Sequence, residues 1–257
     1  VTKKKAMEIN DKVKKIVDKG AELTGSAIGA AIAFYAGGPL SAAAFGVVGT
    51  VVSQTLTEVA NRTLSNREEV RVGATAQQAI TIIELSKSMG KKIRNDDFFS
   101  GDVRSDAEEV FEGCLLASKN THEEKKSIYL GNLFANICFR DDIDKHQSNR
   151  LIHIAEQLSY SQLCLINIFM NKQEYNLRQG NFRNIKTTFK QVVLLQEIYA
   201  MEQSGIMIIK DQHTPGITDV VPSRALVQGV GVALYDLMLL SSISKDECMD
   251  IAKHLSR

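Results

Sequence analysis

The stretch SNREEVRVGATAQQAITIIELSKSMG, from Ser65 to Gly90, shows the pattern on which most of this chain is built. Ser65 is followed three residues later by Glu68, the arrangement in which two side chains cap each other's backbone amides at a helix start. Apolar residues then recur at helical spacing, and Gly90 stands where helices commonly end. The stretch therefore predicts one helix with defined ends.

The same start pattern, a capping residue with an acid or amide three positions later, recurs along the chain. Each occurrence precedes a run with helical apolar spacing, so together they predict a mainly α fold. The five pairs are Ser65/Glu68, Ser105/Glu108, Thr121/Glu124, Asp144/Gln147 and Ser244/Glu247.

A central helical region is predicted over 61–148, with three helices joined by polar turns. From Glu58 to Lys145 the chain carries sixteen acidic and thirteen basic side chains, a balance of about −3. The charged side chains are interpreted as solvated helix faces. Such a surface does not suit nucleic acid, which requires clustered cations.

The last region, 149–257, changes pattern after three further helices. The runs IMII (206–209) and ITDVV (217–221) are short and β-rich, and KDQHTPG separates them. Helices followed by a small β-hairpin predict a winged-helix-like domain. Two more helices, over 223–239 and 244–256, complete it.

The helix in the recognition position of this domain has a mixed charge. Lys186, Lys190 and Gln191 are accompanied by Glu197 and Glu202. From 150 to 257 the chain holds eleven bases and ten acids, about +1 in total. Binding to the phosphate backbone depends on several clustered cations. Nucleic acid is therefore not the expected partner, and a structural or protein-contact role is favoured.

Upstream of Ser65 lies the uncharged run TGSAIGAAIAFYAGGPLSAAAFGVVGTVVSQTL, from Thr24 to Leu56. The AGGP motif at 36–39 interrupts helical continuity, because proline lacks the amide donor and paired glycines favour a turn. The run thus predicts a Gly/Ala-rich helical hairpin within an N-terminal region, 1–60. At about 1.5 Å per residue, each arm reaches roughly 20 to 27 Å, short of a bilayer core of about 30 Å.

Small residues recur every fourth position in both arms of this hairpin. Rows of small side chains let helices approach closely, also where lipid removes the hydrophobic drive. They predict a membrane or oligomer interface, and hence a homo-oligomer. The interface residues are Gly25, Gly29, Ala33, Gly37, Ala42, Gly46, Gly49, Thr50 and Ser53.

A basic amphipathic helix is predicted ahead of the hairpin, with isoleucines and valines on one face. Its seven lysines against three acids give about +4, which suits contact with an anionic lipid surface. The alternative is a solvated helix that packs on its own protein. Arginines follow the run, so both ends are expected on the cytoplasmic side. The candidate lipid-contact residues are Lys3, Lys4, Lys5, Lys12, Lys14, Lys15 and Lys19.

The sequence offers little for catalysis or metal binding. The histidines form no HExxH pair, and the acidic loop RDDIDKH (140–146) is explained as helix capping. GVG at 229–231 lacks the remaining glycine of a dinucleotide loop, and no phosphate loop or nucleophile elbow occurs. We therefore expect no enzyme, no metal and no cofactor.

The four cysteines are widely spaced, each in an apolar helical context. This favours reduced, buried thiols in a cytosolic protein over a disulfide framework or zinc site. The uncharged run begins late for a signal peptide and lacks a cleavage site. We expect a cytoplasmic protein that associates with the inner membrane. The cysteines are Cys114, Cys138, Cys164 and Cys248.

Three successive segments resemble the Abi-alpha family, bacterial proteins linked to abortive phage infection. They are VRVGATAQQAITIIELSKSMGKKI, AEEVFEGCLLASKNTHEEKKSIYLGNLFANI and LIHIAEQLSYSQLCLINIF, about the middle third of the chain. The chain departs from the family in reading NLFANI where the family reads closer to LLAN, and in its longer C-terminal part. The resemblance implies a bacterial defence context and transfers no residue roles.

Two functional hypotheses follow. The first is a bacterial membrane-associated, non-enzymatic effector in which the basic helix docks on anionic lipid and the hairpin inserts or oligomerises. The helical and winged-helix-like body would then receive a signal or a protein partner. The second is a soluble oligomeric interaction or regulatory protein whose hairpin is buried in the oligomer. Its winged-helix-like domain would bind protein or, as the less favoured option, DNA.

Overall fold

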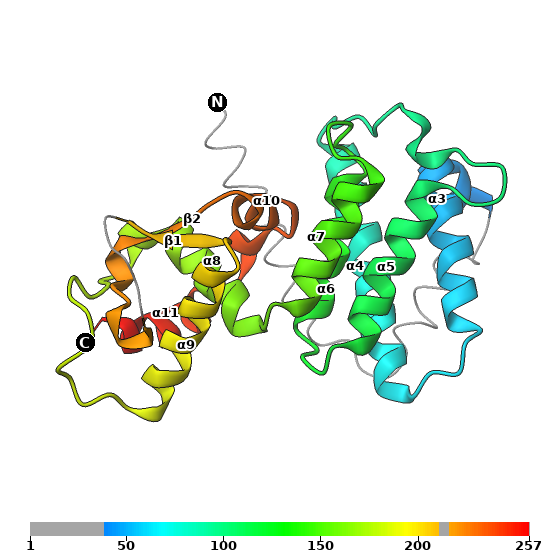
Figure 1. The fold of residues 1–257 in the computed structure, drawn as a ribbon. Helices are drawn as coiled ribbons and strands as arrows, with labels where there is room; N and C mark the ends of the chain where they lie inside the picture. Colours follow the sequence, from blue (N-terminus) through cyan, green and yellow to red (C-terminus); the bar gives the residue numbers. More distant parts are fainter. Residues whose placement is uncertain (1–38, 211–215, 257) are drawn as a thin grey trace. The chain divides into compact units, whose positions relative to one another are not determined.

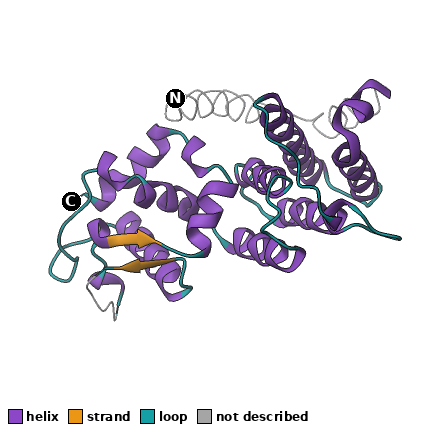
Figure 2. Cartoon of the chain, turned by 90° about the horizontal axis from the view of Figure 1, so that it is seen from above, coloured by secondary structure: helices purple, strands orange, loops and turns teal. Residues whose placement is uncertain are grey.

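The computed structural model describes residues 39–210 and 216–256, with side chains described from Gly46 onward in the first helix. These ranges are mostly helical, with one two-stranded antiparallel sheet (Figures 1 and 2), which confirms the mainly α part of the predicted fold class. The predicted basic helix and the first arm of the hairpin lie outside them. The chain divides into two compact units. Unit 1 holds the described residues through Gln157 together with Leu237–Leu239, and unit 2 holds Leu158–Asp236 and the residues from Leu240 onward.

Unit 1 is a helical bundle organised around its third helix. Helix α5 packs against α3, α4, α6 and α7, and α4 packs extensively against α6 (Figure 1). Unit 1 includes α3, the second arm of the predicted hairpin. The elements are α3 (Pro39–Ala60), α4 (Asn66–Ser88), the 3-10 helix η1 (Asp97–Phe99), α5 (Asp106–Asn120), α6 (Lys126–Ile137) and α7 (Lys145–Gln157).

Helix α6 is buried along its whole length, since α4, α5 and α7 pack around it. A Cβ atom at Gly131 would come within 2.4 Å of the Thr75 carbonyl oxygen, so the close approach of α4 requires glycine. Lys126 carries the single charge of α6, and its Nζ donates to the Glu156 carbonyl at 2.8 Å. Burial lowers the pKa of Lys126, while Glu123 and Glu156 act in the opposite direction.

A network of buried amide side chains holds a distant segment of the chain inside unit 1. Gln78 Nε2 donates to Asn132 Oδ1 at 2.8 Å. Asn132 Nδ2 donates to the Met238 carbonyl at 2.8 Å, and Asn136 Nδ2 donates to the Leu237 carbonyl at 2.9 Å. Buried polar groups are stable when each has a partner. This amide network therefore fixes the segment Leu237–Leu239 against α6.

The helix starts agree with the capping pattern at three of the five predicted positions. Ser65/Glu68 and Ser105/Glu108 form reciprocal boxes, and the Asp144 and Gln147 side chains accept from each other's backbone amides at 2.8 and 2.9 Å. Two boxes that the sequence analysis did not name, Ser159/Gln162 and Thr188/Gln191, begin helices of unit 2.

The other two predicted boxes do not form. Thr121 caps the C-terminus of α5 instead, and α6 begins five residues later, at Lys126. The physical reason is local, because the Thr121 hydroxyl accepts from the amide of Glu123 in a tight turn. Ser244 does precede a helix, but its side chain makes no capping hydrogen bond there.

Unit 2 combines helices with the small sheet. Helix α9 ends before Gly205, whose φ of +76° suits a glycine in the capping position, as the sequence predicts. The elements are α8 (Tyr160–Met170), η2 (Lys172–Glu174), α9 (Phe189–Gln203), β1 (Met207–Ile209), η3 (Ile217–Asp219), η4 (Pro222–Arg224), β2 (Ala225–Val227), α10 (Val230–Leu237), η5 (Leu240–Ser242) and α11 (Lys245–Leu255).

The second strand lies later in the chain than predicted. The run at 217–221 is not a strand and begins as η3. Its Val220 and Val221 side chains are both buried, whereas a strand with one face in the core alternates buried and exposed side chains. The strand that pairs with β1 is β2, with Met207 opposite Val227, inside a segment that was predicted to be helical. A Cβ atom at Gly231 would lie 2.5 Å from the Ile206 carbonyl oxygen, so GVG serves this close packing.

Candidate functional site

The candidate interface is described in part. Gly46, Gly49, Thr50 and Ser53 lie in α3 with their surroundings defined. Ala42 belongs to the same helix, but its side chain is outside the described part. The remaining interface residues, Gly25, Gly29, Ala33 and Gly37, and the lipid-contact lysines Lys3, Lys4, Lys5, Lys12, Lys14, Lys15 and Lys19, also lie outside the described residues.

Helix α3 is interrupted at Gly46. Its φ of 57° and ψ of −142° are non-helical and join two helical segments across a kink. No other atom of the described structure lies within 4 Å of the position that a Cβ would take. Gly46 therefore serves as a backbone joint that a side chain would strain, rather than as a close contact between helices.

Beyond this joint, α3 belongs to the core of unit 1. Val48, Val52, Leu56 and Val59 are each at most 1% exposed, and the helix packs against α4 and α5. Side chains of this kind contribute about 1.5 to 3 kcal/mol each when fully buried. The segment Val48–Val59, which we name the α3 anchor, is thus a structural part of unit 1.

The two rows of small residues face different surroundings. Gly49 is buried and Ser53 is half-buried, so this row faces the bundle. Gly46 and Thr50 are exposed, and the neighbouring Val47 is 50% exposed. The row through Gly46 and Thr50 is therefore the one that unit 1 leaves open to another helix.

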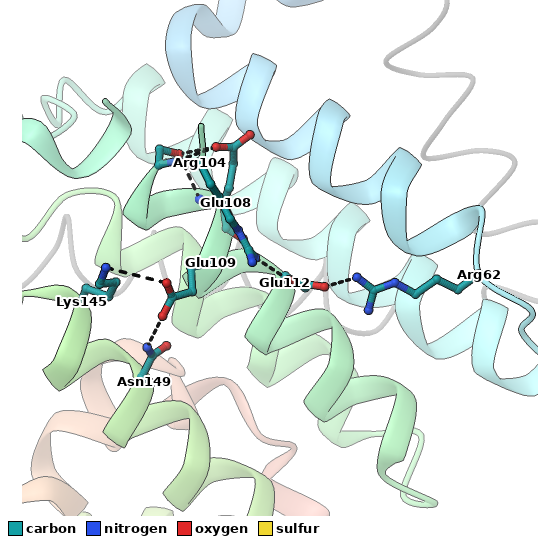
Figure 3. Close-up of polar contacts among 8 residues, drawn as sticks. Arg62, Arg104, Glu108, Glu109, Glu112, Lys145 and Asn149 are labelled. Carbon is teal, nitrogen blue, oxygen red and sulfur yellow. Dashed lines mark hydrogen bonds and ion pairs between the residues drawn. The ribbon is translucent and has the colours of Figure 1, made fainter. Parts of the chain in front are cut away.

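A buried carboxylate attaches the end of α3 to α5. Arg62, two residues beyond α3, donates to Glu112 Oε1, and Arg104 donates to Glu112 Oε2 (Figure 3). Arg104 Nη2 also donates to the Glu108 carbonyl at 3.2 Å. The Glu112 side chain is 14% exposed, so it is not the solvated residue that the sequence analysis expected. We name Arg62, Glu112 and Arg104 the Glu112 clamp.

The charge of Glu112 depends on opposing effects. Burial acts to raise the pKa of its carboxyl, but the hydrogen bonds from Arg62 and Arg104, and then their charges, outweigh burial. The pKa of Glu112 therefore lies below its ordinary value. The clamp carries a stable negative charge between two guanidinium groups at neutral pH.

A second polar cluster ties α5 to α7. Asn149 Nδ2 donates to Glu109 Oε1 at 2.7 Å, while Lys145 Nζ lies 2.8 Å from Asp106 Oδ1 and 3.7 Å from Glu109 Oε2 (Figure 3). The hydrogen bond that Lys145 donates to Asp106 raises the pKa of Lys145. The acidic side chains near the start of α5 are thus bound to lysine and asparagine side chains at the start of α7.

The contacts of the clamp and of the second cluster join helices of unit 1 to one another. Among the described residues, no group of three or more histidine, cysteine or acidic side chains is placed to hold a metal ion. In the acidic loop at 140–146, Asp142 pairs with Arg140 at 2.6 Å and Asp144 caps α7. Two of the three aspartates of this loop are thus bound to the protein itself.

No helix within the described ranges is both long and apolar enough to cross a membrane.

Comparisons with protein-family models, with curated proteins and with solved structures found no match to this chain. The resemblance to the Abi-alpha family therefore stays a prediction from the three quoted segments. Function has to be argued from α3, from the clamp and from the surfaces of unit 2.

The sequence analysis missed the Glu112 clamp, although it named the two neighbouring capping residues. Glu112 lies four residues after Glu108, in a run where acids are expected near a helix start. Arg62 is 50 residues away in sequence, and Arg104 precedes the first turn of α5, so helical spacing gave no signal for either contact. The burial of an acid on the α3 side of α5 is visible only in the folded unit.

Proposed function

We propose that the protein is a bacterial membrane-associated, non-enzymatic effector that acts through its N-terminal segment, in a defence context such as abortive infection. The observation that carries the proposal is the division of α3 at Gly46. The α3 anchor is core, whereas the small-residue row beginning at Gly46 faces away from the core. The uncharged run would thus be held by unit 1 at one end and be available for association at the other.

The α3 anchor joins the N-terminal segment to the core of unit 1. The Glu112 clamp fixes the chain just after α3, and Gly46 lets the direction of the chain change just before the anchor. In this proposal the basic helix docks on anionic lipid, and the hairpin inserts or associates with other copies. The helical body receives the signal or partner that triggers this step.

Binding to vesicles tests the proposal. The full chain should float with vesicles of mixed phosphatidylcholine and phosphatidylglycerol, and less with phosphatidylcholine alone. Removal of residues 1–38 should abolish flotation, and the truncation keeps the whole α3 anchor. A deletion that extends to Leu56 would instead remove core residues such as Val48 and Val52.

A matched pair of charge reversals distinguishes the effect of lipid contact at the predicted basic helix from the effect of the protein's net charge. Lys14/Lys15→Glu should weaken flotation strongly, because these adjacent lysines belong to the predicted basic face. Lys91/Lys92→Glu changes the charge equally at exposed lysines of unit 1 and should leave flotation unchanged. Equal flotation of the truncated and full chains would refute the membrane proposal.

A second candidate function, a soluble interaction protein, is supported by exposed apolar side chains in unit 2. Phe189 is 84% exposed and Val193 is 42% exposed, four residues apart on α9. Met249 is 53% exposed on α11, next to Asp250, whose carboxylate lies 2.9 Å from Lys190 Nζ. Apolar groups of this size suit a protein contact better than a phosphate backbone.

The helix–helix–hairpin order of α8, α9, β1 and β2 supports the winged-helix-like description of this unit. The interaction hypothesis predicts that Phe189→Asp reduces self-association, measured by sedimentation velocity, while vesicle flotation is unchanged. Gln196→Asp, at another exposed position of α9, is the control. Sedimentation that is the same for both variants and the unmodified chain would remove Phe189 as an association site.

A further inference from the structure

The two strands of unit 2 form a small antiparallel sheet with two different faces (Figure 2). Met207, Ile209 and Ala225 are buried, and the sheet packs against α8 and α9. Ile208 and Leu226 lie directly opposite each other and point to the other face, because side chains alternate along a strand. Ile208 is 40% exposed and Leu226 is half-buried. The second face of the sheet therefore presents an apolar cross-strand pair at the surface.

Two cations stand next to this apolar pair. The Lys210 amide donates to the Arg224 carbonyl at 3.0 Å, so the pairing of the strands continues to these two residues. Both side chains are exposed, and neither makes a hydrogen bond or an ion pair with a described residue. Like charges at opposed positions of a sheet destabilise it. The folded unit by itself gains nothing from this arrangement.

A third cation, Lys172, lies beside the backbone of Arg224. Its Nζ donates to the carbonyl of Ser223 at 3.2 Å and to the carbonyl of Ala225 at 3.4 Å, the residues on either side of Arg224. Two neutral carbonyl groups thus hold the ammonium group in place. Positive charge is therefore concentrated at the end of the sheet where β2 begins.

Two acids of the neighbouring segments are bound to other groups. Glu202 Oε1 accepts from the Ile209 amide at 3.3 Å, at the edge of β1. Asp219, in η3, pairs with Arg183. Within the described ranges, none of the three cations has a carboxylate partner. We name the set Ile208, Leu226, Lys172, Lys210 and Arg224 the β1–β2 surface.

We propose that the β1–β2 surface binds an acidic, amphipathic segment of a partner protein. Carboxylates of this segment bind Lys210 and Arg224, since a guanidinium group can hold a carboxylate through two hydrogen bonds. Apolar side chains of the segment cover Ile208 and Leu226. The inference names the partner that the helical body receives, and it rests on the proposed function for its biological role.

The surroundings favour a protein segment over a phosphate backbone. DNA-binding domains with a helix-turn-helix core place a helix in the major groove and surround it with cations. Here α9 is the helix that precedes the sheet, and its only cation, Lys190, is paired with Asp250 at 2.9 Å. The apolar pair of the sheet also has no role in phosphate contact.

Selection of phage-displayed random peptides on the full chain tests the proposal. We expect enrichment of peptides that combine aspartate or glutamate with apolar residues. The most enriched peptide is then labelled, and its binding is measured by fluorescence anisotropy. Replacement of its acids by amides should weaken binding by about tenfold or more, and added salt should also weaken it. A selection that enriches no acidic, apolar peptides overturns the proposal.

Variants locate the binding surface. Lys210/Arg224→Glu should weaken binding of the enriched peptide by about tenfold or more. Ile208→Thr keeps a β-branched residue in the strand and should weaken binding about fivefold. Lys91/Lys92→Glu changes the net charge equally at exposed lysines of unit 1 and is the control. Equal weakening by both double variants would contradict a specific site.

A short DNA duplex and vesicles that contain phosphatidylglycerol are compared with the peptide. If either binds more tightly than the peptide, and Lys210/Arg224→Glu removes that binding, the partner is a nucleic acid or a lipid and the proposal is wrong. Flotation of Lys210/Arg224→Glu with vesicles should equal that of the unmodified chain. The partner inference and the membrane proposal can therefore fail independently.

Lys210→Glu distinguishes a binding role from a structural one. It places opposite charges at the opposed positions, so the midpoint of thermal unfolding should rise by about 1 °C, whereas peptide binding should weaken. A lower midpoint together with weaker binding would show that Lys210 supports the fold, and would overturn the assignment of this residue to a partner.

Discussion

Unit 1 and unit 2 use buried polar side chains in different ways. In unit 1, Asn132 accepts from one amide and donates to a backbone carbonyl at 2.8 Å in each case. In unit 2, Asn167 donates to a sulfur atom at the longer distance of 3.4 Å. Oxygen acceptors form stronger hydrogen bonds than sulfur acceptors. The first arrangement fixes a chain segment through strong hydrogen bonds, whereas the second gives a buried thiol a weaker partner.

The largest expected effect concerns the amide network of unit 1. Asn132→Leu keeps the branching and the number of heavy atoms of the side chain, but it leaves the Gln78 amide and the Met238 carbonyl without their partner. Each buried unsatisfied group costs about 1 to 3 kcal/mol, so we expect a loss of about 3 kcal/mol of unfolding free energy. Urea denaturation gives the free energy, and hydrogen exchange of α6 peptides shows whether unit 1 has loosened.

Asn167→Leu is the matched change in unit 2 and should cost less, about 1 kcal/mol, because the lost acceptor is a sulfur. The Asn171 amide donates to Asn167 Oδ1 at 2.8 Å and also to Tyr235 Oη at 3.0 Å. It therefore keeps a partner in this variant. Equal losses for the two variants would mean that the comparison between the units is wrong.

The Glu112 clamp should give the next largest effect. Glu112→Gln removes the charge that two arginines share, and we expect a loss of about 1 kcal/mol at neutral pH, because both arginines remain 43–44% exposed and partly screened. Urea denaturation at several pH values measures it. Glu58→Gln, at an exposed position of α3, is the control and should change little.

The pH dependence of the clamp has a defined sign. Since the folded-state pKa of Glu112 is lowered, its contribution is present above the ordinary value of 4.5 and is lost as the pH falls through the folded value. The difference in unfolding free energy between the unmodified chain and Glu112→Gln should therefore shrink below pH 4.5. A difference that is constant across this range would contradict the charge-based account.

An effect of about the same size as that of the clamp is expected at Gly46, where the core of unit 1 begins. Gly46→Ala should destabilise the chain by about 1 kcal/mol, because the positive φ disfavours any Cβ even though the space around it is open. Thr50→Ala, in the same exposed row, should not destabilise. Thermal denaturation compares the two. A stabilised Gly46→Ala chain would show that α3 runs straight through this position.

The smallest expected effect concerns a buried hydroxyl group of unit 1 that has no hydrogen-bond partner among the described residues. Thr55 is 3% exposed, and among the described residues its hydroxyl has no hydrogen-bond partner. Thr55→Val keeps the shape and removes the hydroxyl, so we expect a gain of about 0.5 kcal/mol. A loss of stability in urea denaturation would indicate that the hydroxyl has a partner.

Local patterns predicted most of the helices because their causes are local. The boxes at Ser65 and Ser105 involve residues three positions apart, and the structure shows both. The prediction failed at Thr121, where the same residues form a turn instead. It also misplaced the second strand, because β2 is defined by its pairing with β1 across the chain and not by its own composition.

By itself, the sequence determined the mainly helical class and three of the helix starts that it named. These features depend on capping and on spacing within a few residues. Only the tertiary structure decided which row faces the core and that Arg62 shares Glu112 with Arg104. Such contacts join residues that are distant in the chain, and their energies come from burial that exists only once the helices have packed.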